Sequence, residues 1–258
     1  MEMGSVPMKD VMMTKEKIKV HVDKYFGDFH VLQNIHFTIA ENEFVCIVGP
    51  SGCGKTVLLQ IIAGLIPPTK GQVTMDGEPI DPAKQNVSFV FQEPSCLPWR
   101  TLWNDIKFGL EIKGYSQDEI QERVKKIIEI VGLTGFERYY PHQISGGMKQ
   151  RVAIARAFVT QPDLLLMDEP FGHLDAQTRY YMQMEILRIW EQMKRTVIFV
   201  TNNVEEAVYL GERVFVLSPP PAIIKAEIPI KLQRPRDLTD QKFLSIRKEI
   251  TVFYEVMI

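Results

Sequence analysis

The chain has 258 residues, of which 45% are hydrophobic and 24% are charged, and its formal net charge at pH 7 is −2. This composition is ordinary for a globular protein and allows one large domain or a domain with a lobe. It argues against a nucleic-acid binder, because such proteins carry a clear excess of Lys and Arg on one face. The cysteines at positions 46, 53 and 96 form no metal-type pair and cannot all be bridged, which suits a reducing compartment.

No apolar run approaches the roughly 18 residues that a membrane-spanning helix needs. Residues 1–17 mix charges of both signs and lack the continuous apolar segment of a signal peptide. We therefore expect a loose N-terminal extension there and a cytosolic chain, whose membrane association would go through a partner.

In chain order, alternating residues over 17–22 and 29–39 predict two antiparallel strands joined by a turn. The apolar runs at 44–49, 163–170 and 196–201 predict buried strands of a parallel sheet, each followed by a helical pattern.

The middle of the chain has a different pattern. Residues 116–133 place apolar side chains on one helical face, with Ser116 and Glu119 at capping-box spacing and Gly132 as a stop. Residues 101–150 lack any strand pattern, so a helical lobe over about 96–150 is expected as an insertion into the α/β core.

The C-terminal part begins after Ser218 with a proline-rich stretch, which we expect to end the core. Residues 239–256 are then predicted to form a terminal helix. The predicted division of the chain is 1–17, 18–218 and 219–258.

The segment GPSGCGKT matches the phosphate-loop pattern G-x-x-x-x-G-K-[ST] and lies between a predicted strand and an apolar helix. Glycines at such a turn let backbone N–H groups converge on anionic oxygens. Lys55 is expected to reach the β- and γ-phosphates, and Thr56 to hold Mg²⁺. The predicted nucleotide-binding residues of the loop are Gly49, Pro50, Ser51, Gly52, Cys53, Gly54, Lys55, Thr56 and Val57.

Two acidic residues end the apolar run LLLMDEP. Asp168 is expected to orient Mg²⁺ or its water, and Glu169 to act as a general base on the attacking water. A carboxylate pair after a strand can also be a simple helix cap, but the phosphate loop favours the catalytic interpretation.

Ser145, Gly146 and Gly147 precede a helical pattern that carries Lys149 and Gln150 in its first turns. On their own they would indicate a turn with an N-cap serine, but they also form a second anion site at a helix N-terminus. One nucleotide needs only one phosphate loop. The second site makes sense if it closes over nucleotide held by another copy, in a head-to-tail dimer.

The motifs GPSGCGKT, FQEP with Gln92, SGGMKQR, LLLMDEP and HLD with Asp175 occur in the order found in ABC-type ATPases. The chain resembles that family over roughly residues 18–258. The segments VFQEPSCLPWRTLWNDIKFGLEIKG, YPHQISGGMKQRVAIARAF and DEPFGHLDAQTR resemble the nitrate/sulfonate/taurine group of bacterial importers.

The resemblance implies an α/β P-loop NTPase fold: a RecA-like ABC ATPase core with a parallel sheet, an N-terminal antiparallel β-subdomain and an inserted α-helical lobe. It implies ATP and Mg²⁺ as cofactors and a head-to-tail pair of copies at the cytoplasmic face of the membrane. The implied partners are membrane permease subunits and, through them, a solute-binding protein, with no nucleic acid.

Residue roles also follow from the resemblance. Phe26 would stack on adenine, although a packed strand-end aromatic is the alternative. Gln92 would meet Mg²⁺ and the attacking water, and Trp99 could face the permease or pack within the lobe. The residues implied to act on the partner copy's nucleotide are Ser145, Gly146, Gly147, Met148 and Gln150.

Three residues depart from the family pattern. Val57 replaces a second hydroxyl residue, which should weaken nucleotide binding by on the order of 1 kcal/mol. Asn202 replaces the switch histidine, and an amide can donate an N–H to a phosphate but cannot carry charge. We expect ATP binding and dimer closure to survive while hydrolysis slows. His173, in the D-loop, could compensate from the partner copy or could be an ordinary loop residue.

These patterns predict the ATP-hydrolysing subunit of a bacterial importer for a small anionic or related solute. The alternative is a nucleotide-binding regulatory subunit with impaired hydrolysis, for which Asn202 and Val57 are the evidence. A soluble ABC ATPase of DNA repair or translation is disfavoured, because the chain has no long coiled-coil insertion and no second cassette. The neighbouring Asn203 and Glu206 are spaced as a capping box, which predicts a structural role for Asn203.

Overall fold

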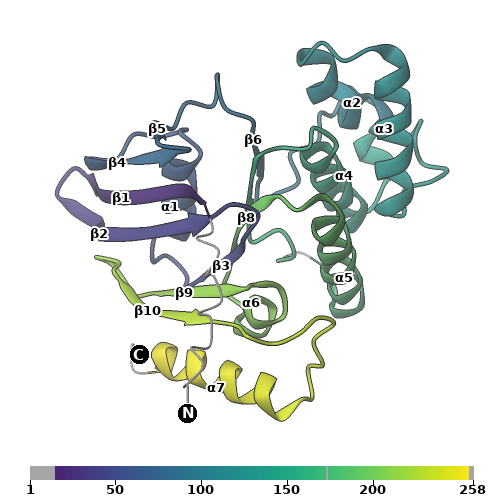
Figure 1. Cartoon of the computed structure of the whole chain (residues 1–258). Helices are drawn as coiled ribbons and strands as arrows, with labels where there is room; N and C mark the ends of the chain where they lie inside the picture. Colours follow the sequence, from purple (N-terminus) through teal and green to yellow (C-terminus); the bar gives the residue numbers. More distant parts are fainter. Residues whose placement is uncertain (1–14, 173, 256–258) are drawn as a thin grey trace, which may run out of the picture.

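The computed structural model describes residues 15–172 and 174–255. Figure 1 shows an N-terminal sheet, a central sheet flanked by helices, and a helical lobe that projects to one side. Residues 1–14 of the predicted N-terminal extension lie outside the described residues. Its end needs correction, because Glu16 and Lys17 already belong to the first strand and Lys17 is buried.

The N-terminal sheet is antiparallel, with strand order β2-β1-β4-β5. Its strands are β1 (Glu16–Phe26), β2 (Phe29–Ala40), β4 (Lys70–Met75) and β5 (Glu78–Pro79). Alternate residues of β1, such as Ile18 and Val20, are fully buried and pack in one hydrophobic cluster with helix α1 (Lys55–Ile62). Lys17 donates to Asp76 at 2.6 Å and so links the first strand to the turn between β4 and β5. The predicted antiparallel pair is confirmed.

The central sheet has the strand order β10-β9-β3-β8-β7-β6. Its strands are β10 (Ile224–Pro229), β9 (Arg213–Leu217), β3 (Phe44–Val48), β8 (Thr196–Thr201), β7 (Leu164–Asp168) and β6 (Val87–Val90). All neighbours from β9 to β6 are parallel, which confirms the three predicted apolar strands. The carboxyl ends of these parallel strands therefore share one edge, where the loops after β3, β6, β7 and β8 meet.

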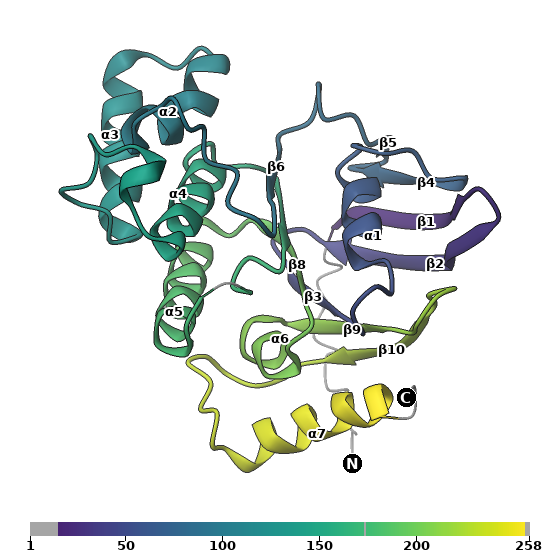
Figure 2. The ribbon, with the colours of Figure 1, turned by 180° about the vertical axis from the view of Figure 1, so that it is seen from behind.

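Strand β10 corrects the expectation that the core ends after Ser218. It pairs antiparallel with β9 at the edge of the central sheet, and Pro229 is its last residue. Proline is compatible with an edge strand because the missing N–H costs no ladder bond there. The predicted terminal helix is confirmed as α7 (Gln241–Glu255), which lies along α6 (Val204–Leu210) and β10 in both views (Figures 1 and 2).

The helical lobe contains α2 (Leu102–Ile112) and α3 (Gln117–Ile130), followed by a short 3-10 turn and by α4 (Gly146–Val159). All of residues 101–150 are described, and none of them is in a strand, as predicted. Ser116 and Glu119 form both halves of a capping box at the start of α3, and Gly132 follows its end at φ +65°. Helix α5 (Ala176–Met193) packs beside the lobe in Figure 2. Across the described chain, every helix is too short or too polar to cross a membrane.

Candidate nucleotide site

The phosphate loop leaves β3 and enters α1, and two of its glycines are required for different reasons. Gly54 is the N-cap of α1 at φ 101°, a left-handed conformation that favours glycine. A Cβ at Gly49 would lie 2.7 Å from the Cys53 sulfur, so this position has no room for a side chain. The loop's backbone is thereby drawn close around the start of α1.

Lys55 is buried in this loop, with only 5% of its side chain exposed. Its Nζ donates to the carbonyl oxygens of Gly49 at 2.9 Å and Pro50 at 3.0 Å. The same ammonium lies 3.5 Å from Oε1 of Glu169. Lys55 thus connects the strand end of β3 with the strand end of β7, and its donors can turn to an anion that enters the cleft.

An open cleft of about 460 Å³ lies above the loop. It is lined by Phe26, Phe29, Val31, Ser51, Gly52, Gly54, Lys55, Thr56, Val57, Gln92 and Glu169. Phe26 is 51% exposed, which rules out the alternative of a packed core aromatic. The cleft therefore has aromatic side chains at one end and charged side chains at the other, an arrangement suited to the nucleobase and the phosphates of a nucleotide. Cys53 is fully buried and is not among the residues that line it.

Asp168, at the end of β7, fits a hard cation. It is 3% exposed, and no described residue hydrogen-bonds to its Oδ1. Burial raises the pKa of its carboxyl, against the lowering effect of a hydrogen bond from the Thr56 hydroxyl. No group of three or more His, Cys, Asp or Glu converges anywhere in the described residues. Mg²⁺ is usually held by one or two protein oxygen ligands, and substrate phosphates and water complete its coordination. The Asp168 carboxylate and the Thr56 hydroxyl match this small set of ligands.

Glu169 follows at φ 42°, an unusual conformation for a non-glycine residue. Its backbone N–H donates to the Val200 carbonyl oxygen at 2.8 Å, which holds the residue against the end of β8. The carboxylate receives hydrogen bonds from Gln92 at 3.5 Å and Asn202 at 3.4 Å. Three strand-end loops thus bring these side chains together.

A second, smaller cleft of about 250 Å³ shares Gln92 and Glu169 with the first. Its remaining lining residues are Phe171, Gly172, Arg179, Thr201, Asn202, Asn203 and Glu206. The sequence motifs did not indicate Arg179 here, nor Phe29 and Val31 in the first cleft. The alternating pattern of β2 could have placed Phe29 and Val31 on one face of the strand, but no local signal marks Arg179.

The two asparagines after β8 have different surroundings. The Asn203 side chain accepts from the backbone N–H groups of Glu205 at 2.9 Å and Glu206 at 3.3 Å, so its prediction as a helix N-cap is confirmed. The reciprocal half of the capping box is wrong. The buried Glu206 carboxylate accepts instead from the Thr201 hydroxyl and from Gln183 at 2.9 Å. Burial raises the pKa of Glu206.

The predicted signature residues lie at the start of α4 and line neither cleft. Ser145 is the N-cap and accepts from the Met148 N–H at 3.3 Å. A Cβ at Gly146 would meet no atom within 4 Å, so the backbone there is open to an approaching group. Gln150 differs from them, because it is 2% exposed and neither atom of its amide has a hydrogen-bond partner within the described part of the chain.

The D-loop prediction is described only in part. His173 lies outside the described residues. Asp175 is the N-cap of α5 and accepts from the Thr178 N–H at 3.0 Å. This hydrogen bond lowers the pKa of the Asp175 carboxyl.

Residues 32–172 match the family model described as ABC transporter. The chain belongs to the ABC transporter family. It is 49% identical to an uncharacterized ABC transporter ATP-binding protein of Methanocaldococcus jannaschii, over 95% of this chain and 93% of that one. It is 45% identical to an aliphatic sulfonates import ATP-binding protein of Bacillus cereus, over 91% and 94% of the two chains. A nitrate import ATP-binding protein of Synechocystis is 41% identical, over 88% and 85%.

Solved structures agree with this assignment. A dimeric ATP-binding cassette in a post-hydrolysis state, bound to ADP and Pi, superposes with a TM-score of 0.74 at 30% identity. The match covers 84% of this chain and 100% of that cassette. The predicted α/β P-loop NTPase fold is confirmed, and this ABC chain is an ATP-binding protein with the ATPase activity of its family.

Proposed function

We propose that this chain is the ATP-hydrolysing subunit of an importer for a small anionic solute. In this proposal it acts as a head-to-tail dimer beneath permease subunits at the cytoplasmic face of the membrane. One observation carries the catalytic part. Lys55 follows β3, whereas Asp168 and Glu169 stand at the end of β7, and the Lys55 ammonium lies 3.5 Å from Glu169 in one cleft. The relatives named for sulfonate and nitrate import support the solute class.

In the proposed site, Phe26 stacks on adenine and Lys55 moves from the loop carbonyls to the β- and γ-phosphates. Thr56, Asp168 and Gln92 hold Mg²⁺, which neutralises phosphate charge when it is bound. Glu169 takes the proton of the attacking water, because its carboxylate lies between the two clefts. Asn202 donates an N–H to the γ-phosphate in place of its bond to Glu169.

The head-to-tail dimer is supported by the separation of the signature from both clefts. Gly146 stands at the N-terminus of α4, which Ser145 caps, and its backbone has space around it. A helix N-terminus of this kind can bind the phosphates of a nucleotide held by another copy. The two halves of each active site would then come from different chains, with the D-loop at their junction.

A mixing experiment tests this composite site. Lys55→Ala removes the phosphate-loop cation, and Ser145→Arg blocks the signature, so each variant alone should lose nearly all ATPase activity in the assembled transporter. A mixed dimer retains one site with both an intact loop and an intact signature. We expect the mixture to recover a quarter to a half of wild-type activity by statistical pairing, whereas no recovery would contradict a site shared between chains.

The permease contact is supported by Trp99, which is 71% exposed in the loop that precedes the lobe. An exposed large aromatic is typical of an interface and not of lobe packing. We propose that this loop receives the membrane subunit, while a solute-binding protein supplies the solute from the other side. Trp99→Ala should then weaken co-purification with the permease while leaving ATP binding by the isolated chain unchanged.

The solute class can be tested by uptake. Cells with the complete importer should accumulate radiolabelled alkanesulfonate, taurine or nitrate, and the Glu169→Gln variant should abolish this uptake. Uptake that survives Glu169→Gln would show that another ATPase drives transport. Uptake of none of these anions would contradict the proposed solute class.

A further inference from the structure

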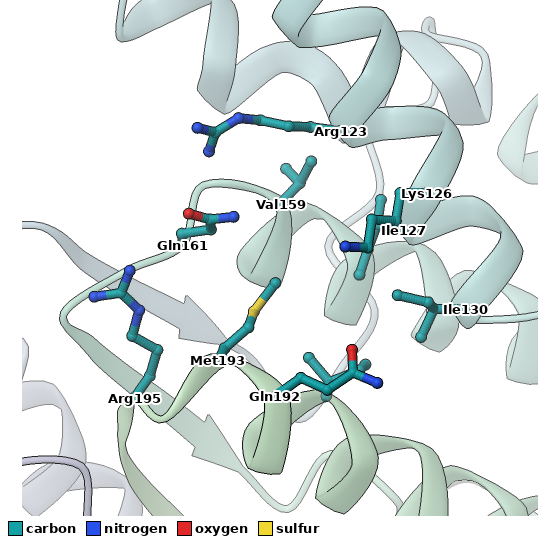
Figure 3. A pocket seen from close by; sticks show the side chains of 10 residues that line it. Arg123, Lys126, Ile127, Ile130, Val159, Gln161, Gln192, Met193 and Arg195 are labelled. Carbon is teal, nitrogen blue, oxygen red and sulfur yellow. The ribbon is translucent and has the colours of Figure 1, made fainter.

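A second kind of pocket lies away from the nucleotide clefts, where the helical lobe meets the core (Figure 3). It has a volume of about 330 Å³ and forms between α3 of the lobe, the segment that follows α4, and the end of α5 with the residues after it. None of its lining residues belongs to the two clefts above. A ligand in this pocket would touch both the lobe and the core.

The two ends of the pocket differ in chemistry. Figure 3 shows the polar ends of Arg123, Gln161 and Arg195 on the same side. Most of the other lining side chains are apolar, namely Ile127, Ile130, Val159, Ile189 and Met193, and the polar Lys126 and Gln192 lie among them. Three basic residues, Arg123, Lys126 and Arg195, are among the described residues that line the pocket, and none of these lining residues is acidic. The pocket is thus complementary to a molecule with an anionic head and an apolar body.

The guanidinium groups have unused donors. Nη1 of Arg123 and Nε of Arg195 are buried and have no hydrogen-bond partner among the described residues. Arg123 stacks on Tyr115, 4.5 Å from the ring centroid, which holds its guanidinium in place without supplying an acceptor. A different nitrogen of Arg195, Nη1, lies 3.3 Å from Oδ1 of Asp163. Buried donors are ordinarily satisfied, so these two indicate an acceptor that residues 15–172 and 174–255 do not provide.

We propose that this pocket binds a small organic monoanion, a carboxylate or sulfonate that carries a short apolar chain. The anionic head lies against Arg123, Gln161 and Arg195, and the chain lies on the apolar wall between Ile130 and Met193. Because the ligand bridges α3 and the end of α5, its binding favours one arrangement of the lobe relative to the core. The proposal does not depend on the transport function, since it concerns a site of the isolated chain.

Calorimetric titration of the full chain with 1-butanesulfonate tests the site, with saturating MgADP present to occupy the phosphate loop. We expect a dissociation constant on the order of 1 mM, ordinary for a ligand of about eight non-hydrogen atoms. Arg123→Gln should weaken binding at least fivefold. Lys125→Gln is the matched control, because it removes the same charge from an exposed neighbour on α3 outside the pocket and should change binding less than twofold.

A second variant addresses the apolar wall independently. Ile130→Trp should fill the pocket and abolish binding, with folding checked by MgADP affinity, so the test does not rest on Arg123 alone. Equal effects of Arg123→Gln and Lys125→Gln would overturn the proposal, because they would indicate non-specific attraction. Inorganic sulfate that binds as tightly as butanesulfonate would overturn it too, as would undetectable binding by the wild-type chain.

Discussion

The side-chain amide of Asn202 donates a hydrogen bond to the carboxylate of Glu169 over 3.4 Å. The same carboxylate accepts a hydrogen bond from the Gln92 amide at 3.5 Å and lies 3.5 Å from the Lys55 ammonium. The proposed base is therefore held by two neutral amides and one cation before nucleotide enters. An amide at position 202 can orient the base and donate to a phosphate, but it adds no charge. This relationship makes Asn202 the residue at which the turnover rate is best tested.

Asn202→His should raise the hydrolysis rate. A hydrogen bond from a charged donor contributes about 1 kcal/mol more than a neutral one, which corresponds to a rate increase of about fivefold. Phosphate release by the assembled transporter at saturating MgATP measures it. Asn203→Ser is the control, because it keeps a helix cap without adding charge to the cleft and should leave the rate nearly unchanged. An unchanged rate in Asn202→His would refute the slowed-hydrolysis hypothesis.

Glu169→Gln should separate binding from hydrolysis. The amide preserves the size of the side chain and removes its basicity, so ATP hydrolysis should fall at least a hundredfold, the usual contribution of general-base catalysis. ATP affinity should stay the same or rise, because a negative charge near the phosphates is lost. Light scattering should detect a dimer that persists in MgATP. A variant that keeps more than a tenth of wild-type turnover would exclude Glu169 as the base.

Val57→Ser should restore the hydroxyl that the phosphate loop lacks. One added net hydrogen bond to a phosphate is worth about 1 kcal/mol, so the dissociation constant for ATP should fall about fivefold. Val57 is half-buried beside the N-terminal cluster, so Val57→Ala, which reproduces the loss of packing without a hydroxyl, is the control. Equal affinities of the Ser and Ala variants would mean that position 57 does not contact the nucleotide.

Arg236→Ala should destabilise the chain by about 3 kcal/mol, because it leaves buried acceptors without a donor. The Arg236 guanidinium is buried and donates to the carbonyl oxygens of Val208 at 2.6 Å, Tyr209 at 3.1 Å and Gly211 at 2.6 Å, at the end of α6. Burial lowers its pKa to about 10, so it stays charged at neutral pH. Urea unfolding measures the loss of free energy.

Arg247→Ala is the matched control for this clamp. Arg247 pairs with Glu205 at 2.6 Å, also between the C-terminal segment and α6, but both side chains are 42% exposed. Its removal should cost less than about 1 kcal/mol. Equal losses in the two variants would show that burial of Arg236 does not strengthen its contacts.

Alkylation of the cysteines should depend steeply on pH. Burial raises the pKa of the Cys96 thiol to about 11, so its thiolate fraction, and with it the rate of reaction with iodoacetamide, should rise about a hundredfold between pH 7 and pH 9. Burial also raises the pKa of Cys53, which is fully buried beneath Gly49 and should react more slowly still. Peptide mass spectrometry distinguishes the two sites. Faster labelling of Cys53 than of Cys96 would contradict this order.

The features that the sequence itself indicated depend on short-range patterns. The loop around Lys55, the acidic pair after β7, the capping box of Ser116 and the cap at Asn203 each involve residues within a few positions of one another. The strands β3, β7 and β8 were recognised because strands buried on both faces read as continuous apolar runs. From these elements alone, the family and the parallel sheet could be predicted, and most residues of the candidate nucleotide site could be named.

The features that only the tertiary structure decided involve contacts between distant residues. Strand β10 joins the core because β9 offers it a free edge, although the proline-rich sequence around it suggested that the core had ended. Glu206 bonds to Gln183 of another helix instead of its own cap, and Gln150 is buried within a motif whose first residues are exposed. The pocket at Arg123 and Arg195 also depends on how the lobe packs against α5.

Sequence by itself determined which chemical groups this protein carries and where its strands end, because those signals are local. The packing of the fold decided which groups are buried, paired or left with an unused donor, because hydrogen bonding and solvent access depend on neighbours that the chain brings together only on folding.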